Sequence, residues 1–235
     1  MTSIGQMSAA LSDQAEAPGR KTAEARRNQV VLAAVSLFSK KGYFQTTIED
    51  IANAAGVSKG LVYLYFADKL DVLFYTLRYV LDFYGRELPA LLKDVEHPLE
   101  RLETALRTYC GLIDNHRDET VLAYQSTKIL PAEQRAVVKA AESKVNRIIQ
   151  DCMEDCLYQG LMERVNLDFL VYQFATFCHT WALKHWAFRD KYTLDEYAEE
   201  GIRLLIDPHL TDKGRAEKAG LAEAVDSAQE PETFD

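Results

Sequence analysis

Side chains suited to binding phosphate oxygens concentrate in one stretch of this 235-residue chain, between Thr46 and Lys69. The stretch combines hydroxyls, ammonium groups and a glycine that allows close approach of the backbone, namely Thr47, Ser58, Lys59, Gly60, Tyr63, Tyr65 and Lys69. Hydroxyl and ammonium groups donate hydrogen bonds to phosphate oxygens, and helix N-termini attract the same anions. These residue types therefore predict a surface that contacts phosphate.

Outside this stretch, no arrangement of side chains indicates catalysis. His179 and His185 are six residues apart, about 240° around a helix, so they do not share a face. The sequence also contains no phosphate-binding loop, nucleophile elbow or metal-hydrolase motif. We therefore expect no enzyme, no catalytic residues and no catalytic cofactor.

Two of the four cysteines leave an alternative open. Cys152 and Cys156 are four residues apart and share a helix face, which suits two thiolate ligands or a redox-active pair. No histidine or acidic residue with clear ligand spacing accompanies them, so we assign no metal ligands. Ordinary packing of the thiols in a core is the competing interpretation, and a redox or metal sensor remains the alternative function.

The formal net charge of −9 is unevenly distributed along the chain. Residues 20–69 include eight basic and four acidic residues, a net +4, so the other residues carry −13. A basic head on an acidic body suits a protein that meets a polyanion with one end only. Residues 1–20 lack the pattern of a secretion signal. Every apolar run in the sequence is also shorter than the roughly 18–20 residues that a helix needs to span a bilayer. We therefore expect a cytoplasmic location and no membrane partner.

The periodicity of the apolar residues predicts the helices that carry the phosphate-contacting residues. A first helix is predicted over residues 22–40, because its apolar residues recur at i, i+3, i+4 and i+7: Val31, Ala34, Val35 and Phe38. Thr46 with Glu49 forms a capping box for a second helix, and Thr47 with Asp50 offers the same geometry one residue on.

A glycine turn connects this second helix to a third. Gly56 tolerates the left-handed backbone that the turn needs, and Ser58 caps the third helix, which runs through Tyr65. Two short helices joined in this way are typical of a helix-turn-helix, whose second helix enters the major groove of DNA.

The remaining sequence is also helical in period, and strand signals are nearly absent. Asp68 caps a fourth helix, which Pro89 kinks or ends. Five further helices are predicted over residues 98–115, 118–128, 132–159, 167–188 and 193–206. We therefore predict an all-α protein of about nine helices.

The order of residues in the helix-turn-helix resembles the TetR family of transcriptional regulators. The matching residues are Thr47, Ile51-Ala52, Ala55-Gly56-Val57-Ser58, Lys59-Gly60, Tyr63-Leu64-Tyr65-Phe66 and Lys69. The resemblance covers residues 22–70 directly, and the nine-helix plan extends it to about residue 207. It implies an N-terminal three-helix DNA-binding domain over 21–68 and a larger helical effector-binding and dimerisation domain over 69–210. Residues 1–20 and 211–235 are expected to be flexible tails.

By this resemblance, the partner is a double-stranded DNA operator. The DNA-facing residues would be Thr47, Ser58, Lys59, Gly60, Leu61, Tyr63, Tyr65 and Lys69. Leu61 and Leu64 depart from the family pattern on the recognition helix, which affects the operator sequence rather than DNA binding itself. Phe66 is expected in the core. Arg26 and Arg27 contact DNA backbone or minor groove, or are ordinary surface charges.

The resemblance also implies a homodimer through the eighth and ninth helices and a small-molecule effector in the body. An effector that changes the spacing of the two heads would release a repressor from a palindromic operator. Candidate ligand-binding residues are aromatic and polar groups of the body: Tyr79, Phe83, Tyr109, Tyr124, Gln125, Phe174, Cys178, His179 and Trp181. Core packing is the competing interpretation for each of them.

A second resemblance concerns the effector. Tyr124-Gln125, followed by a basic segment that ends in Leu-Pro, and Thr180-Trp181 with Trp186 and Arg189 are similar to the acyl-CoA-responsive branch of the family. An acyl-CoA thioester needs an apolar tunnel for its acyl part and cations for its phosphates. Candidate cations are Lys128, Arg135, Lys139, Lys184, Arg189 and Lys191, although each is also typical of an ordinary surface.

Overall fold

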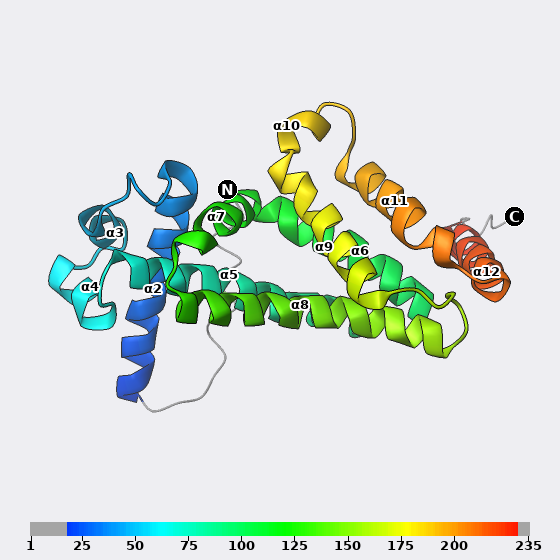
Figure 1. Cartoon of the computed structure of the whole chain (residues 1–235), viewed down its shortest axis with the longest axis horizontal. Coiled ribbons are helices and arrows are strands. Elements are labelled where there is room, and N and C mark those ends of the chain that lie inside the picture. Colours follow the sequence, from blue (N-terminus) through cyan, green and yellow to red (C-terminus); the bar gives the residue numbers. More distant parts are fainter. Residues whose placement is uncertain (1–17, 230–235) are drawn as a thin grey trace, which may run out of the picture. The chain divides into compact units, whose positions relative to one another are not determined.

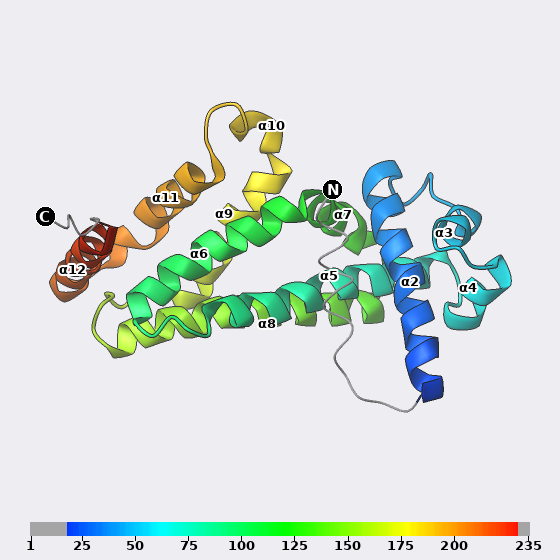
Figure 2. The same ribbon diagram turned by 180° about the vertical axis from the view of Figure 1, so that it is seen from behind.

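The computed structural model describes residues 18–229, and the all-α prediction is confirmed (Figures 1 and 2). Its helices are α2 (Pro18–Lys41), α3 (Ile48–Ala54), α4 (Lys59–Tyr65), α5 (Lys69–Leu92), α6 (Pro98–Asn115), α7 (Arg117–Ser126), α8 (Ala132–Tyr158), α9 (Leu167–Leu183), α10 (His185–Phe188), α11 (Leu194–Leu205) and α12 (Asp212–Gln229). Two short 3₁₀ turns, Thr127–Ile129 and Asp207–His209, and an isolated bridge between Met162 and Leu210 complete the regular structure of this range.

Of the two alternatives for Pro89, an end to the helix is wrong, and one predicted helix boundary is wrong as well. Helix α5 continues through Pro89 to Leu92, and Leu88 and Leu92 on either side of the proline are fully buried. The helix predicted over residues 167–188 is instead two helices, α9 and α10, because the backbone leaves helical geometry at Lys184, with φ −124° and ψ 26°.

The C-terminal segment expected to be a flexible tail contains a helix, α12, over Asp212–Gln229. The Lys218 ammonium lies 2.9 Å from a Glu103 carboxylate oxygen and 2.5 Å from an Asp207 carboxylate oxygen. At Gly214, an added Cβ would lie 2.1 Å from the backbone oxygen of Leu161. Ion pairs and a close glycine contact hold this helix against the rest of the second unit. Neither kind of contact requires an apolar stripe, so no periodic signal for the helix appears in the sequence. The other predicted tail, residues 1–20, lies outside the described residues except for 18–20, which begin α2.

The chain divides into two compact units. The first extends to Arg86 and includes Ile113–Lys144, and the second comprises Glu87–Leu112 together with Val145 onwards. The domain boundary predicted at Lys69 does not coincide with this division, because the first turns of α5 and all of α7 group with the N-terminal helices.

In the first unit, α3 and α4 pack against α2 (Figure 1). The predicted apolar face of α2 is buried: Val31, Ala34, Val35 and Phe38. Ile51 and Phe66 also lie in this core, so the prediction for Phe66 is confirmed. Burial of these side chains fixes α4 by its inner face and leaves its other face to solvent.

In the second unit, α9 packs against α11. Gly201 of α11 allows this contact, because a Cβ there would lie 2.4 Å from the ring of Phe177. The Phe177 ring stacks on that of Tyr197 at 4.4 Å, and the Tyr197 hydroxyl donates to the Phe177 carbonyl oxygen. Aromatic packing therefore joins α9 and α11, which lie in the segments that the family resemblance assigned to dimerisation.

Candidate DNA-binding surface and effector residues

The turn between α3 and α4 has the predicted geometry. Gly56 adopts φ +64°, which L-residues with a side chain rarely adopt, and the Ser58 hydroxyl accepts a hydrogen bond from the amide of Leu61. Ser58 therefore caps α4 as expected, and α4 begins immediately at Lys59.

Helix α4 presents a mixed polar and apolar face to solvent. Lys59 and Gly60 are exposed, as are the side chains of Tyr63, at 51%, and Leu64, at 72%. Leu61 and Tyr65 are half-buried. Leu64 is thus largely exposed in the part of the chain that the structure describes.

The capping box of α3 uses the second of the two registers. The Thr47 hydroxyl accepts from the Asp50 amide at 3.0 Å and donates to the Asp50 carboxylate at 2.8 Å. Hydrogen bonds donated to the Asp50 carboxylate by the Thr47 amide, at 2.9 Å, and by the Thr47 hydroxyl lower the pKa of Asp50. Thr46 is instead buried, and its hydroxyl donates to the Gly42 carbonyl oxygen at 2.9 Å. Thr47 remains exposed at the start of α3, where the resemblance assigns it to DNA.

Lys69 differs from the other predicted DNA-facing residues. Its ammonium donates to the carbonyl oxygens of Tyr43 and Thr46, at 3.1 and 3.0 Å, and lies 4.4 Å from the centre of the Tyr43 ring. Lys69 thereby ties the start of α5 to the loop between α2 and α3. This geometry supports a role in positioning α3 and α4.

Five of the predicted effector residues gather in the second unit, on α6 and α9. The Tyr109 hydroxyl lies 2.6 Å from Nε2 of His179, and both side chains are buried. Burial lowers the pKa of His179 to about 4, so its imidazole is neutral near pH 7. Phe174 and Cys178 are fully buried on the same helix, and the Trp181 ring packs 4.9 Å from that of Tyr197.

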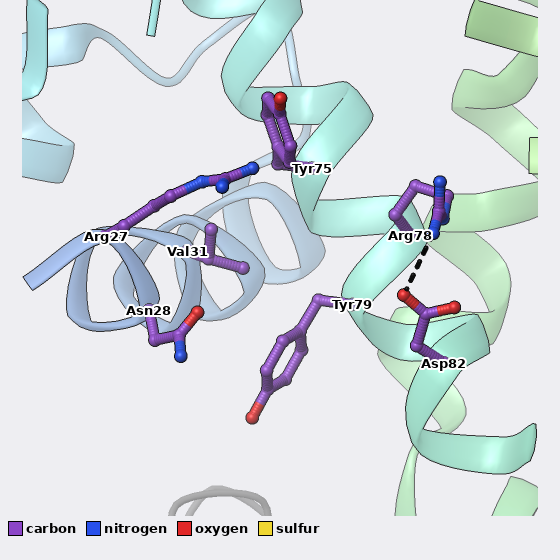
Figure 3. A pocket seen from close by; sticks show the side chains of 7 residues that line it. All are labelled: Arg27, Asn28, Val31, Tyr75, Arg78, Tyr79 and Asp82. Atoms are coloured by element: carbon purple, nitrogen blue, oxygen red, sulfur yellow. Dashed lines mark hydrogen bonds and ion pairs between the residues drawn. The ribbon is translucent and has the colours of Figure 1, made fainter. Parts of the chain in front are cut away.

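The other four predicted effector residues belong to the first unit and are not grouped there. Phe83 is buried with its ring edge-on to His116 at 4.9 Å. Tyr79 lines an open cavity between α2 and α5 (Figure 3). Tyr124 and Gln125 are exposed on α7. The predicted effector set is thus divided between core, cavity and surface.

The cysteine alternative receives no support from the geometry. Cys152 and Cys156 are buried, and burial raises the pKa of Cys152 and that of Cys156, the latter to about 12. Protonated thiols are poor metal ligands and poor nucleophiles. Among the residues that the structure describes, no group of three or more histidine, cysteine or acidic side chains could hold a metal ion.

Comparison with known proteins decides the family. Residues 30–76 match the family described as bacterial regulatory proteins, tetR family, and residues 95–205 match the tetracyclin repressor-like C-terminal domain. The chain belongs to the TetR family. Transcriptional regulators of this family bind DNA operators as dimers and respond to small-molecule effectors.

Two relatives support this assignment. The chain is 46% identical to HTH-type transcriptional regulator HbdR of Aromatoleum sp. (strain CIB), over 94% of this chain and 96% of HbdR. It is 29% identical to HTH-type transcriptional repressor KstR2 of Mycobacterium tuberculosis, over 68% of this chain and 80% of KstR2. These relatives are named as regulators, not enzymes.

The solved structures share the fold. The crystal structure of transcriptional regulator FadR from Bacillus subtilis in complex with stearoyl-CoA superimposes with a TM-score of 0.65 at 19% identity, covering 77% of this chain and 97% of FadR. FadR from Bacillus halodurans superimposes with a TM-score of 0.67 at 18% identity, covering 83% of this chain and 97% of that one. At these identities the similarity concerns the fold alone.

The cations expected to hold effector phosphates are divided between the two units. Lys128 and Lys139 belong to the first unit, Lys184, Arg189 and Lys191 belong to the second, and all five are exposed. Arg135 is half-buried, with its guanidinium 3.5 Å from two carbonyl oxygens. No helix in the described range is long and apolar enough to cross a membrane.

Sequence reasoning missed one arrangement of arginines. Tyr75, Arg78, Tyr79 and Asp82 of α5 line the cavity shown in Figure 3, and Arg27 of α2 reaches toward Tyr75. The spacing of the α5 residues at i, i+3, i+4 and i+7 is visible in the sequence, but it does not reveal which helix these residues meet.

Proposed function

We propose that this TetR-family regulator is a repressor that binds a palindromic operator as a homodimer and leaves it when an acyl-CoA thioester binds. The observation that carries DNA binding is the exposed face of α4, where Lys59, Tyr63 and Leu64 project beside a capped N-terminus. An ammonium and a phenol suit phosphate, and a leucine suits a thymine methyl group.

Exposed aromatic side chains support dimerisation through α9, α10 and α11. Phe169 and Tyr172 of α9 are more than half exposed, and Trp186 of α10 is 72% exposed. Leu204 of α11 adds an exposed aliphatic group. Large apolar side chains lose contact with water in a dimer, so such a surface favours association of two copies.

Two observations support an acyl-CoA as the effector: the ligand named with a protein of the same fold, and the apolar side chains of α6 and α9 in the second unit. Stearoyl-CoA is the ligand named with FadR of Bacillus subtilis, which shares this fold. The α6 and α9 cluster of Tyr109, Phe174 and Trp181 is strongly apolar, with the neutral His179 as a hydrogen-bonding group inside it. An acyl chain needs such apolar surroundings. The polar pair of Tyr109 and His179 could orient the carbonyl group of a thioester by hydrogen bonding.

Selection of bound duplexes from random-sequence DNA, followed by gel shifts with an acyl-CoA series, tests the proposal. We expect a palindromic site, and we expect release of DNA by thioesters but not by the matching free acids or by CoA alone. A non-palindromic consensus would contradict the dimeric repressor, and failure of every thioester to release DNA would remove the acyl-CoA effector. Sedimentation of Trp186→Glu, with the exposed Lys144→Glu as a control, tests the dimer surface.

A further inference from the structure

Helix α7 depends on its neighbours for its position. It comprises ten residues, Arg117–Ser126, and an isolated helix shorter than about 12–15 residues is marginal in water. Within the described part of the chain, its N-cap residue His116 makes no side-chain hydrogen bond to the first turn. Contacts with other helices of the first unit therefore hold α7 in place.

One of these neighbours is the first helix of the DNA-binding head. Helix α7 packs against α2, the helix on which α3 and α4 also pack (Figures 1 and 2). All four helices belong to the first compact unit. The position of α7 therefore bears on the helix that supports the recognition helix α4.

A chain of two buried hydrogen bonds joins α7 to α5. The Thr120 hydroxyl donates to the His116 carbonyl oxygen at 3.0 Å, which uses the only hydrogen of that hydroxyl. The Tyr84 hydroxyl lies 3.1 Å from the same Thr120 oxygen and is therefore the donor between the two. Burial raises the pKa of Tyr84, so its hydroxyl keeps the hydrogen that it donates.

Ring packing accompanies these hydrogen bonds at the start of α7. The buried imidazole of His116 lies edge-on to the rings of Phe83 and Tyr84, at 4.9 and 6.1 Å between ring centres. Apolar packing is non-directional, whereas a hydrogen bond requires a particular distance and angle. The bond between Tyr84 and Thr120 therefore determines where α7 is held along α5.

We propose that Tyr84 and Thr120 are positioning residues for DNA binding. Their hydrogen bond fixes α7 on α5, and α7 in turn holds α2 in the arrangement that binds DNA. Tyr84 and Thr120 are 3% and 4% exposed, so they act through α7 and α2. The inference rests on the DNA-binding part of the proposed function and requires neither the acyl-CoA effector nor the dimer surface.

Fluorescence anisotropy of the full-length variants, with a duplex enriched from random-sequence DNA, tests this role. Tyr84→Phe and Thr120→Val should each weaken binding about fivefold, the loss typical of one hydrogen bond between neutral groups. The double variant should bind no more weakly than either single variant, because both changes remove the same bond. Thr120→Ser keeps a hydroxyl and should bind as the wild type does.

Thr76→Val is the matched control on α5. Thr76 is also buried, and its hydroxyl donates at 2.8 Å to the Val72 carbonyl oxygen of the same helix. Its replacement should lower stability in urea unfolding and leave DNA affinity unchanged. The same result for Tyr84→Phe would show a merely structural role and overturn the proposal. Tighter DNA binding by Tyr84→Phe would also overturn it, because the bond would then oppose the DNA-binding arrangement.

Hydrogen exchange tests the same contact without DNA. Tyr84→Phe should accelerate exchange of the amides of α7 and α2 beyond the change that Thr76→Val causes, because α7 is less firmly held. Equal exchange in the two variants would overturn the positioning role. If the wild type enriches no duplex, the proposed function fails, and the exchange of α2 still decides whether Tyr84 and Thr120 position this helix.

Discussion

The hydroxyl of Tyr109 and Nε2 of His179 lie 2.6 Å apart in the core of the second unit, 70 residues apart in sequence. The Tyr109 ring is edge-on to the imidazole at 5.4 Å, so the pair is held by packing as well as by the hydrogen bond. Burial keeps the imidazole neutral, because a charged imidazole would lose its hydration. This pair therefore couples the stability of the second unit to pH.

The pKa of His179 predicts loss of stability in mild acid. Burial lowers this pKa to about 4 from the 6.5 of an unfolded chain, so the unfolded state binds more protons between these values. The contribution is fully present above pH 6.5 and is lost as pH falls toward 4. We expect wild type to lose about 2 kcal/mol more than His179→Gln between pH 7 and 4.5, measured by urea unfolding. Parallel pH profiles for the two proteins would contradict this expectation.

Lys59 is predicted to contribute a sequence-independent contact with DNA. Its exposed ammonium at the first position of α4 suits a backbone phosphate, so Lys59→Ala should weaken binding to all duplexes by a similar factor. The slope of log affinity against log salt concentration should fall by about 1, as one fewer counterion is released. Fluorescence anisotropy over a salt series measures both. Lys144→Ala, an exposed change on α8, should leave the slope unaltered, and an unaltered slope for Lys59→Ala would remove Lys59 from the interface.

We predict that Lys69 supports DNA binding indirectly, by stabilising the position of α3. Lys69→Ala removes hydrogen bonds to the Tyr43 and Thr46 carbonyl oxygens and leaves both to water, at a cost of about 1–2 kcal/mol. Thermal unfolding should show this loss, and operator affinity should fall with it because α3 is less firmly held. Weaker DNA binding with unchanged stability would instead indicate direct contact between Lys69 and DNA. Lys59→Ala serves as the comparison, since Lys59 is exposed at the start of α4.

Local patterns were enough to predict the head, because its structure depends on residues near one another in sequence. The glycine turn at Gly56, the Ser58 cap and the buried Phe66 all follow from short-range geometry. The register of α3 was the exception. Thr46 and Thr47 are equivalent as caps by spacing, and burial of Thr46 against the Gly42 carbonyl decides between them.

Long-range pairs could not be predicted in the same way. The Nε2 of His97 lies 2.9 Å from a Glu217 carboxylate oxygen across 120 residues, and no periodicity in either segment indicates the other. The effector residues were chosen by residue type, which does not distinguish the buried Phe83 from the exposed Tyr124. Likewise, nothing in the sequence of α2 indicates that Arg27 stacks on Tyr75.

The docking of α12 provides a final prediction, with a matched control in the same helix. A Cβ at Gly214 would lie 2.1 Å from the Leu161 backbone oxygen, and a backbone atom cannot move aside as a flexible side chain can. Gly214→Ala should therefore force α12 away from this segment and cost about 1–3 kcal/mol in urea unfolding. At Gly220, nothing lies within 4 Å of an added Cβ, so Gly220→Ala should gain about 0.5–1 kcal/mol from the better helix propensity of alanine. Hydrogen exchange at Thr211, whose amide donates to the Leu161 oxygen, should accelerate in the first variant only. Equal stability and equal exchange in the two variants would mean that α12 does not dock through this glycine.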